Sequence, residues 1–149
     1  MASEIEPEKP GRRLEQALAA FPHAQAIGMT LEPQPDGRLL VGAPYDERLI
    51  GDPATGVIHG GVVTTLLDTG CGVAAGLKLK GKAWVATLDL RIDYMRPSKP
   101  GHAIKARCEC YRLTRSVAFC RGVAFDDDEA DPVATAAGAF MITNTGWKE

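Results

Sequence analysis

The spacing of hydrophobic and polar residues changes near Gly81, and this change divides the chain into two parts. After it, four segments alternate apolar and polar residues with a period of two, which is typical of β-strands with one buried face. These segments span residues 84–94, 103–113, 117–125 and 133–142. The links between them are short and contain Pro, Gly, Ser or charged residues, so we expect antiparallel neighbours.

One long apolar segment precedes these strands. From about Gly60 to Leu77 the chain is rich in small and apolar residues, and its only charge is Asp68. A helix of this composition must be buried on most sides. One such helix followed by four antiparallel strands predicts an α+β hot-dog fold, in which a curved antiparallel β-sheet wraps around one long central helix.

Smaller elements are expected ahead of the helix. Residues 12–21 place Leu, Ala and Phe along one side and predict a short helix that Pro22 ends. Two strands are expected at 26–32 and 38–45, and the turn residues at 33–37 join them as a hairpin.

The remaining segments define the expected domain organisation. Residues 1–11 predict a disordered leader, and the polar stretch 46–58 predicts a loop that leads into the helix and could act as a lid. With 149 residues, the chain is long enough for one domain with its own core. We therefore expect a leader and short helix over 1–24, a hot-dog domain over 25–143 and a C-terminal tail over 144–149.

Composition excludes several classes of function. Lys and Arg number 17 against 19 Asp and Glu, a net charge of −2, so no broad surface for nucleic acid or anionic membrane is expected. No apolar run approaches the roughly 20 residues that cross a bilayer, and the acidic start does not resemble a signal peptide, so a cytoplasmic location is expected. The four cysteines form no CxxC pair, which predicts buried thiols and no metal site.

Candidate chemistry lies at the start of the long helix. His59, Gly60 and Gly61 precede it, and the first backbone N–H groups of a helix have no intrahelical partner, so they can receive an oxygen that becomes negative. Asp68 lies about two turns further on among apolar residues, where a charge is costly without a partner or a task. This arrangement indicates an acyl-transfer site. The alternative is an Asp68 on the solvated face of an ordinary amphipathic helix.

The motifs around these residues resemble a known family. The segment from Gly56 through His59 to Asp68, then residues 87–97 with Gly101, and the closing strand 134–141 resemble hot-dog acyl-CoA thioesterases of the phenylacetate-degradation (PaaI-like) type. Both motifs occur in order and at fitting spacing, and the resemblance covers roughly residues 25–143. It implies hydrolysis of an acyl-CoA to a free acid and CoA, with CoA as part of the substrate and no other cofactor.

The resemblance also implies roles for individual residues. Asp68 corresponds to the nucleophile or the base for water, the Gly60 N–H to the oxyanion donor, and Thr87 to a residue that orients water. His59 polarises the thioester or, more in keeping with its place before the helix, pins the turn. The residues expected to contact the substrate or its CoA part are Gly61, Tyr94, Arg96, Ser98, Arg115 and Ser116.

Three further features bear on this assignment. Pro53 stands where the family commonly has a polar residue, often Asn, and the candidates to substitute for that residue are Asp52 and Thr55. The phosphates of CoA need cations, for which Lys99 and Arg121 are further candidates behind Arg96 and Arg115. The acidic run 126–129 is expected to be a solvated hairpin tip that repels such a ligand.

Helix geometry predicts that the site is shared between subunits. Eight residues at about 1.5 Å each separate Gly60 from Asp68 by about 12 Å along the axis, too far for both to touch one carbonyl group. We therefore expect composite sites across a dimer interface, with Thr87 assisting from the opposing subunit. The resemblance agrees, since it implies homodimers that often double into homotetramers.

Two other functions stay open at this point. A hot-dog hydratase or dehydratase would act on enoyl or hydroxyacyl thioesters, but its pairing of a catalytic His with an acid is not found here. A non-catalytic acyl-CoA sensor or binding module would retain the fold, and the Pro53 departure gives it some weight. The acyl group itself is not predicted, and candidates for lining its tunnel are Leu49, Ile50, Val63, Leu67 and Trp84.

Overall fold

A computed structural model describes residues 14, 18–80 and 83–143 of the chain. The predicted leader (1–11), the tail (144–149) and half of the helix predicted over 12–21 lie outside these residues.

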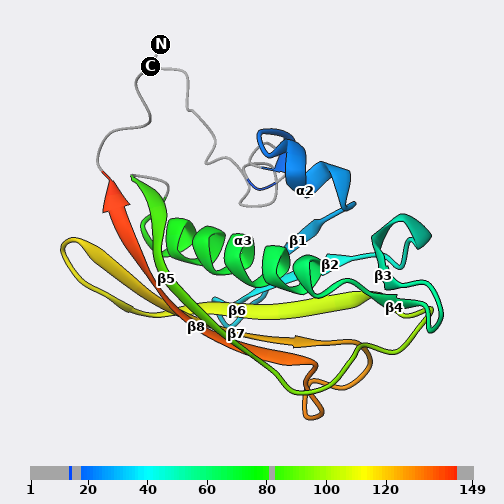
Figure 1. Ribbon diagram of the computed structural model, residues 1–149. Coiled ribbons are helices and arrows are strands. Elements are labelled where there is room, and N and C mark those ends of the chain that lie inside the picture. Colours follow the sequence, from blue (N-terminus) through cyan, green and yellow to red (C-terminus); the bar gives the residue numbers. More distant parts are fainter. Residues whose placement is uncertain (1–13, 15–17, 81–82, 144–149) are drawn as a thin grey trace.

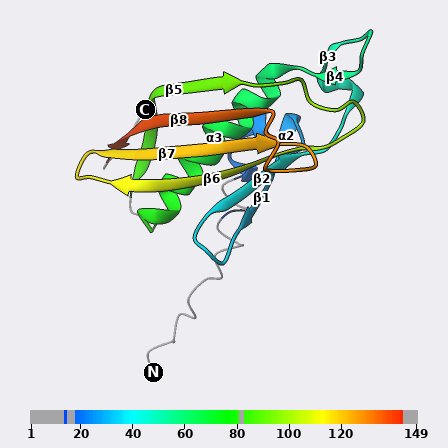
Figure 2. The ribbon, with the colours of Figure 1, turned by 90° about the horizontal axis from the view of Figure 1, so that it is seen from below.

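The described chain forms one six-stranded antiparallel sheet with a long helix across one face (Figures 1 and 2). The order of its strands is β1-β2-β6-β7-β8-β5, so β1 and β5 are the edges. The strands are β1 (Thr30–Pro33), β2 (Leu39–Ala43), β5 (Trp84–Tyr94), β6 (Ile104–Leu113), β7 (Val117–Phe125) and β8 (Ala134–Thr143). The helix is α3 (Gly60–Lys78). The predicted hot-dog fold is therefore confirmed.

The face of α3 toward the sheet forms the core. Leu66, Leu67 and Cys71 of the helix are completely buried, and α3 contacts β6 and β7 most extensively. Helix and sheet approach closely at Gly70, where a Cβ atom would lie 2.7 Å from the Cys108 sulfur. A side chain at this position would push α3 away from the sheet and open the core.

Helix α3 also corrects the expectation that no segment is long and apolar enough to cross a membrane. Its 19 residues satisfy that condition by length and mean hydropathy. However, the same apolar residues fill the core of the described domain. The helix is thus explained as the central element of the fold.

The N-terminal region differs from the prediction at Pro22. This residue begins a short helix, α2 (Pro22–Ala26), because proline is favoured in the first turn, where its missing N–H is not needed. The strand predicted from Ala26 consequently begins only at Thr30. Helix α2 lies against the side of α3 away from the sheet (Figure 1), where His23 Nε2 is 3.2 Å from Thr65 Oγ1.

The predicted loop over 46–58 is more ordered than expected. It contains a 3-10 turn, η1 (Glu47–Leu49), and a two-stranded antiparallel hairpin of β3 (Ile50–Asp52) and β4 (Val57–Ile58). The Tyr45 hydroxyl donates a hydrogen bond to the Gly56 carbonyl over 2.9 Å and holds this hairpin. The hairpin lies beside the N-terminus of α3 (Figure 1).

Candidate active site

The start of α3 is built around one peptide group. His59 is the N-cap residue, and its Nδ1 accepts a hydrogen bond from the Gly61 N–H over 2.9 Å. The side chain therefore pins the turn, which is one of its two predicted roles, by accepting a hydrogen bond from a backbone amide. A Cβ atom on Gly61 would lie 2.8 Å from Nδ1, so this cap needs glycine at position 61.

The two glycines have different tasks in this arrangement. Gly61 was predicted to contact the substrate, but its N–H donates to His59 Nδ1 and is therefore not free to bind one. The N–H of Gly60 has no acceptor among the described residues. A Cβ atom on Gly60 would meet the Tyr94 ring at an ordinary 3.5 Å. Of the two glycines, only Gly60 therefore has a backbone N–H that is free to bind a ligand. Because Gly60 has no side chain, a ligand can approach that N–H closely.

Asp68 is held by the neighbouring strand. It is half-buried and faces β5, where Thr87 Oγ1 donates a hydrogen bond to Asp68 Oδ1 over 2.8 Å. No described residue donates to the other carboxylate oxygen. Both residues belong to one chain, which corrects the expectation that Thr87 approaches from the opposing subunit.

A β-bulge sets the direction of the β5 side chains. The register against β8 shifts between Thr87 and Asp89, so that Leu88 has no partner of its own. Before the bulge, Thr87 faces α3 at an odd-numbered position. After it, Leu90 and Tyr94 face the core or α3 at even-numbered positions. The extra residue thus brings both Thr87 and Tyr94 to the helix, which strict alternation would forbid.

Tyr94 contacts the first turn of α3. Its hydroxyl donates to the Gly60 carbonyl over 2.9 Å and lies 2.6 Å from Thr64 Oγ1. Thr64 Oγ1 also lies 3.2 Å from the same carbonyl. Thr64 is not among the predicted site residues, although its spacing of four from both Gly60 and Asp68 places all three on one helix face.

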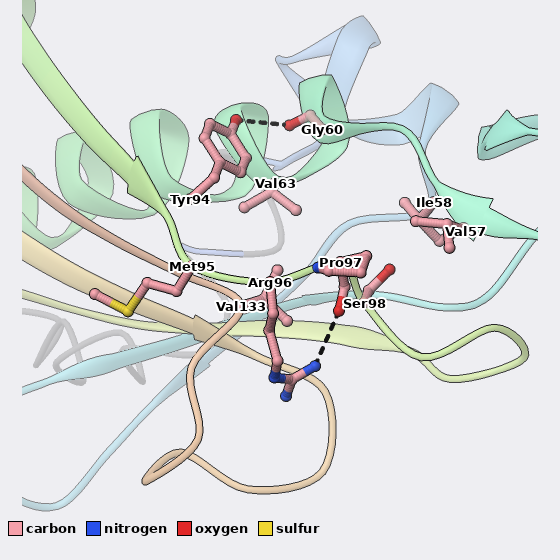
Figure 3. A pocket seen from close by; sticks show the side chains of 10 residues that line it. All are labelled: Val57, Ile58, Gly60, Val63, Tyr94, Met95, Arg96, Pro97, Ser98 and Val133. Atoms are coloured by element: carbon pink, nitrogen blue, oxygen red, sulfur yellow. Dashed lines mark hydrogen bonds between the residues drawn. The ribbon is translucent and has the colours of Figure 1, made fainter.

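A cavity of about 350 Å³ opens beside Gly60 (Figure 3). Its walls combine apolar side chains with polar groups and come from β4, α3, the end of β5, the segment after it and the residue before β8. They consist of Val57, Ile58, Gly60, Val63, Tyr94, Met95, Arg96, Pro97, Ser98 and Val133. Among the predicted tunnel residues, only Val63 lines it. Tyr94, Arg96 and Ser98, three of the residues predicted to contact the substrate, also line it. The Ser98 hydroxyl is buried without a hydrogen-bond partner among the described residues.

Arg96 does not serve as a free cation. It donates to both carboxylate oxygens of Asp126, over 2.7 and 2.9 Å, and also pairs with Asp131. Asp126 is completely buried, and the hydrogen bonds from Arg96 hold its pKa well below the usual range of a carboxyl group. The prediction that residues 126–129 form a fully solvated tip is therefore wrong at Asp126, and Arg96 is committed to this ion pair.

The other predicted cations fall into two groups. Lys99 is paired with Asp127 and Arg121 with Glu109. Arg115 and Ser116 are exposed in the turn between β6 and β7, and no described residue forms an ion pair with Arg115. This turn lies at the end of the sheet opposite the N-terminus of α3 (Figure 1), so the charge of Arg115 is far from Gly60 of the same chain.

Asp52 and Thr55, the candidates to replace the polar residue that Pro53 displaces, both form hydrogen bonds within their own turn. The Asp52 carboxylate accepts hydrogen bonds from the Ala54 N–H over 3.0 Å and from Thr55 Oγ1 over 2.8 Å. These contacts shape the turn between β3 and β4. Neither side chain lines the described cavity.

The cysteines are buried thiols, as expected. All four are free, and within the described residues no group of His, Cys, Asp or Glu side chains is arranged to hold a metal ion. The hydrogen bond with Cys108, together with burial, raises the pKa of Cys71, and burial raises the pKa of Cys120. Burial and the raised pKa values both disfavour the reactive thiolate form of Cys71 and Cys120.

Comparisons with known proteins agree on one family. A family model described as thioesterase superfamily matches residues 55–133. A provisionally named esterase of Halobacterium salinarum is 34% identical over 122 residues, which cover 78% of this chain and 81% of that protein. The medium/long-chain acyl-CoA thioesterase YigI of Escherichia coli K12 is 28% identical over 139 residues, covering 82% of this chain and 86% of that protein.

Solved structures show the same fold. A Pseudomonas aeruginosa protein superimposes with a TM-score of 0.79 at 43% identity and covers 88% of this chain and 97% of its own. A thioesterase of Haemophilus influenzae gives a TM-score of 0.79 at 20% identity, with 93% of this chain and 94% of its own covered, which supports the fold alone.

Proposed function

The chain is an enzyme of the thioesterase superfamily, and from this premise we propose that it hydrolyses acyl-CoA thioesters to a carboxylic acid and CoA, in the manner of the phenylacetate-degradation type. The observation that carries the proposal is the hydrogen bond from Thr87 to Asp68. It holds one carboxylate oxygen and leaves the other without a described donor. The acyl-CoA specificity in the name of the Escherichia coli relative supports this class of substrate.

The proposed reaction uses two groups of α3, the Asp68 carboxylate and the Gly60 N–H. Asp68 accepts a proton from water, whose oxygen attacks the thioester carbonyl carbon, or it attacks that carbon itself and water hydrolyses the resulting anhydride. The carbonyl oxygen becomes negative and accepts a hydrogen bond from the Gly60 N–H. The carbon–sulfur bond then breaks, and CoA leaves as a thiolate that takes up a proton.

We propose that each site combines Gly60 of one subunit with Asp68 of the partner subunit. Within one chain the two groups are about 12 Å apart along the helix axis. The edge strand β5 exposes large apolar side chains, Trp84 and Leu88, and Met95 follows directly. An exposed apolar edge strand favours pairing with a second copy, which supports a homodimer along β5 and, beyond it, a homotetramer.

The charged part of CoA is proposed to contact the turn at Arg115 and Ser116. Arg115 carries a charge without a described ion-pair partner, whereas Arg96 is neutralised by Asp126. The apolar side chains in the walls of the cavity beside Gly60 suit the uncharged part of the substrate.

The test is hydrolysis of a panel of aryl, short-chain and medium-chain acyl-CoAs, followed with a thiol reagent. The protein's own thiols should react little with this reagent because all four cysteines are buried. Asp68→Asn should lower kcat about a hundredfold or more without lowering the melting temperature. The matched control is Asp93→Asn, since Asp93 is exposed on β5, the strand that carries Thr87, and pairs only with Arg91 among the described residues.

Other outcomes identify the alternatives. Acyl-CoA binding without turnover by the wild-type protein would favour a sensor. A change in the absorbance of an enoyl thioester without release of CoA would favour a hydratase. Unchanged turnover in Asp68→Asn would contradict the proposed mechanism while leaving the reaction in place.

A further inference from the structure

We infer that Tyr94 is a positioning residue, which fixes the peptide group between Gly60 and Gly61 and thereby aims the Gly60 N–H at the substrate. The inference rests on the proposed function, because it concerns the oxyanion donor of that reaction. It assigns the Tyr94 hydroxyl to the protein's own backbone rather than to a substrate contact.

The first step is the geometry of that peptide group. Its carbonyl, on Gly60, accepts the hydrogen bond from the Tyr94 hydroxyl over 2.9 Å, and Thr64 Oγ1 lies 3.2 Å from the same oxygen. Its N–H, on Gly61, donates to His59 Nδ1 over 2.9 Å. Both ends of one peptide group are thus held by side chains. Figure 3 shows the Tyr94 hydroxyl beside the Gly60 carbonyl, with the hydrogen bond that joins them.

The second step is the need for such restraint. Two consecutive glycines at a helix start have more conformational freedom than any other pair of residues. The first turn of a helix also lacks part of its backbone hydrogen bonding. A donor that must meet a developing oxyanion cannot move freely, since catalysis by such donors depends on their being oriented before the reaction. The Gly60 N–H belongs to the preceding peptide group, which is joined to the fixed one through the φ and ψ rotations of Gly60, so fixing one peptide group restricts both rotations.

The third step is electrostatic. Tyr94 donates to the carbonyl of a peptide group whose N–H donates to His59, so the hydrogen bonds run in one direction through that peptide. Bonds arranged in this way polarise one another and strengthen the whole chain. Loss of the Tyr94 hydroxyl therefore also weakens the cap that His59 provides.

The fourth step is the origin of the contact in β5. Tyr94 reaches α3 only because the bulge at Leu88 changes which residues of the strand face the helix. The same bulge leaves Thr87 facing Asp68. One strand therefore holds both proposed catalytic groups of a chain, Asp68 through Thr87 and Gly60 through Tyr94.

The experiment compares Tyr94→Phe with Tyr111→Phe in steady-state hydrolysis of the best acyl-CoA substrate. Phenylalanine keeps the ring and removes only the hydroxyl. Tyr111 is a matched control because it is equally exposed, at 50% against 51% for Tyr94, and lies on β6 against Arg121. We expect kcat of Tyr94→Phe to fall about tenfold, the scale of one lost hydrogen bond, with KM changed less than twofold. Tyr111→Phe should retain the wild-type kcat and KM.

The outcomes separate this inference from the proposed function. A wild-type protein without thioesterase activity would overturn the proposed function and, with it, this inference. An active wild type with an unchanged kcat in Tyr94→Phe would overturn the inference alone. A raised KM with unchanged kcat would also overturn it, because it would make Tyr94 a substrate-binding residue. A fall in kcat together with a lower melting temperature is resolved by assaying at a temperature where both proteins are folded; a recovered kcat there overturns the inference.

Discussion

Thr87 and Asp68 are joined by a hydrogen bond of 2.8 Å between side chains that are 19 positions apart in one chain. The bond depends on three separate features: the position of Asp68 on the β5 side of α3, the antiparallel pairing of β5 at the sheet edge, and the bulge at Leu88. It orients one carboxylate oxygen and leaves the second without a donor among the described residues.

Removal of the Thr87 hydroxyl should therefore impair catalysis rather than folding. Thr87→Val keeps the branched shape and removes the donor, and kcat should fall about tenfold or more because hydrogen bonds to charged groups are the stronger ones. Thr87→Ser retains a hydroxyl and should lose less. Steady-state kinetics of both variants check this, and equal losses would show that the hydroxyl has no role.

A proline at position 60 should remove the oxyanion donor while leaving the helix intact. Gly60 is the first residue of α3, where proline is favoured, and His59 has φ −60° and ψ 134°, a conformation that proline accepts in the residue before it. Gly60→Pro should lower kcat about a hundredfold or more, the scale of a lost oxyanion donor. Gly60→Ala keeps the N–H and should lose much less. Circular dichroism verifies the fold, and similar kcat values for the two variants would contradict the role of the Gly60 N–H.

The sequence predicted the elements that depend on local periodicity. The bounds of α3 and β5 were predicted to within a residue, because each carries a long pattern with clear turn residues beside it. The error at Pro22 arose because a proline that ends one helix can also begin the next.

The site was predicted less completely than the fold. Asp68 and Gly60 stand out because a lone charge and a glycine pair are unusual in an apolar helix. The bulge at Leu88 cannot be recognised from the alternation of apolar and polar residues in β5. That alternation therefore could not predict that both Thr87 and Tyr94 contact α3. The burial of Asp126 was missed because it depends on Arg96, 30 positions earlier, and an acidic run by itself indicates solvent.

Asp126 should stabilise the fold in a manner that depends on pH. Its pKa lies below the ordinary 3.8 in the folded protein because Arg96 donates to it, so its contribution is present above that value and is lost as the pH falls through the lower folded-state pKa. Asp126→Asn should lower the free energy of unfolding at pH 7 by about 3 kcal/mol, the scale of a broken buried pair.

Urea unfolding at several pH values measures this contribution. The difference between wild type and Asp126→Asn should narrow below about pH 4, where the unfolded carboxyl begins to take up protons. Asp127→Asn is the matched control, since Asp127 is exposed beside it and should change the midpoint little. A constant difference down to pH 2 would contradict the assignment.

The composite site makes a prediction that no single-chain site can satisfy. Asp68→Asn and Gly60→Pro each remove one half of every site in a homodimer, so each variant alone should be nearly inactive. In a heterodimer of the two, one site combines the intact Gly60 of the first chain with Asp68 of the partner subunit, while the other site loses both groups. Random mixing by coexpression makes about half of the dimers heterodimers, each with one working site, so about a quarter of the wild-type activity should return. If instead Gly60 and Asp68 of the same chain formed the site, every site would lack one group, and coexpression would restore nothing. The measurement is the activity of the coexpressed mixture and of the doubly tagged heterodimer purified from it, which has one working site of two and should show about half of the wild-type activity, with each purified homodimer as the reference.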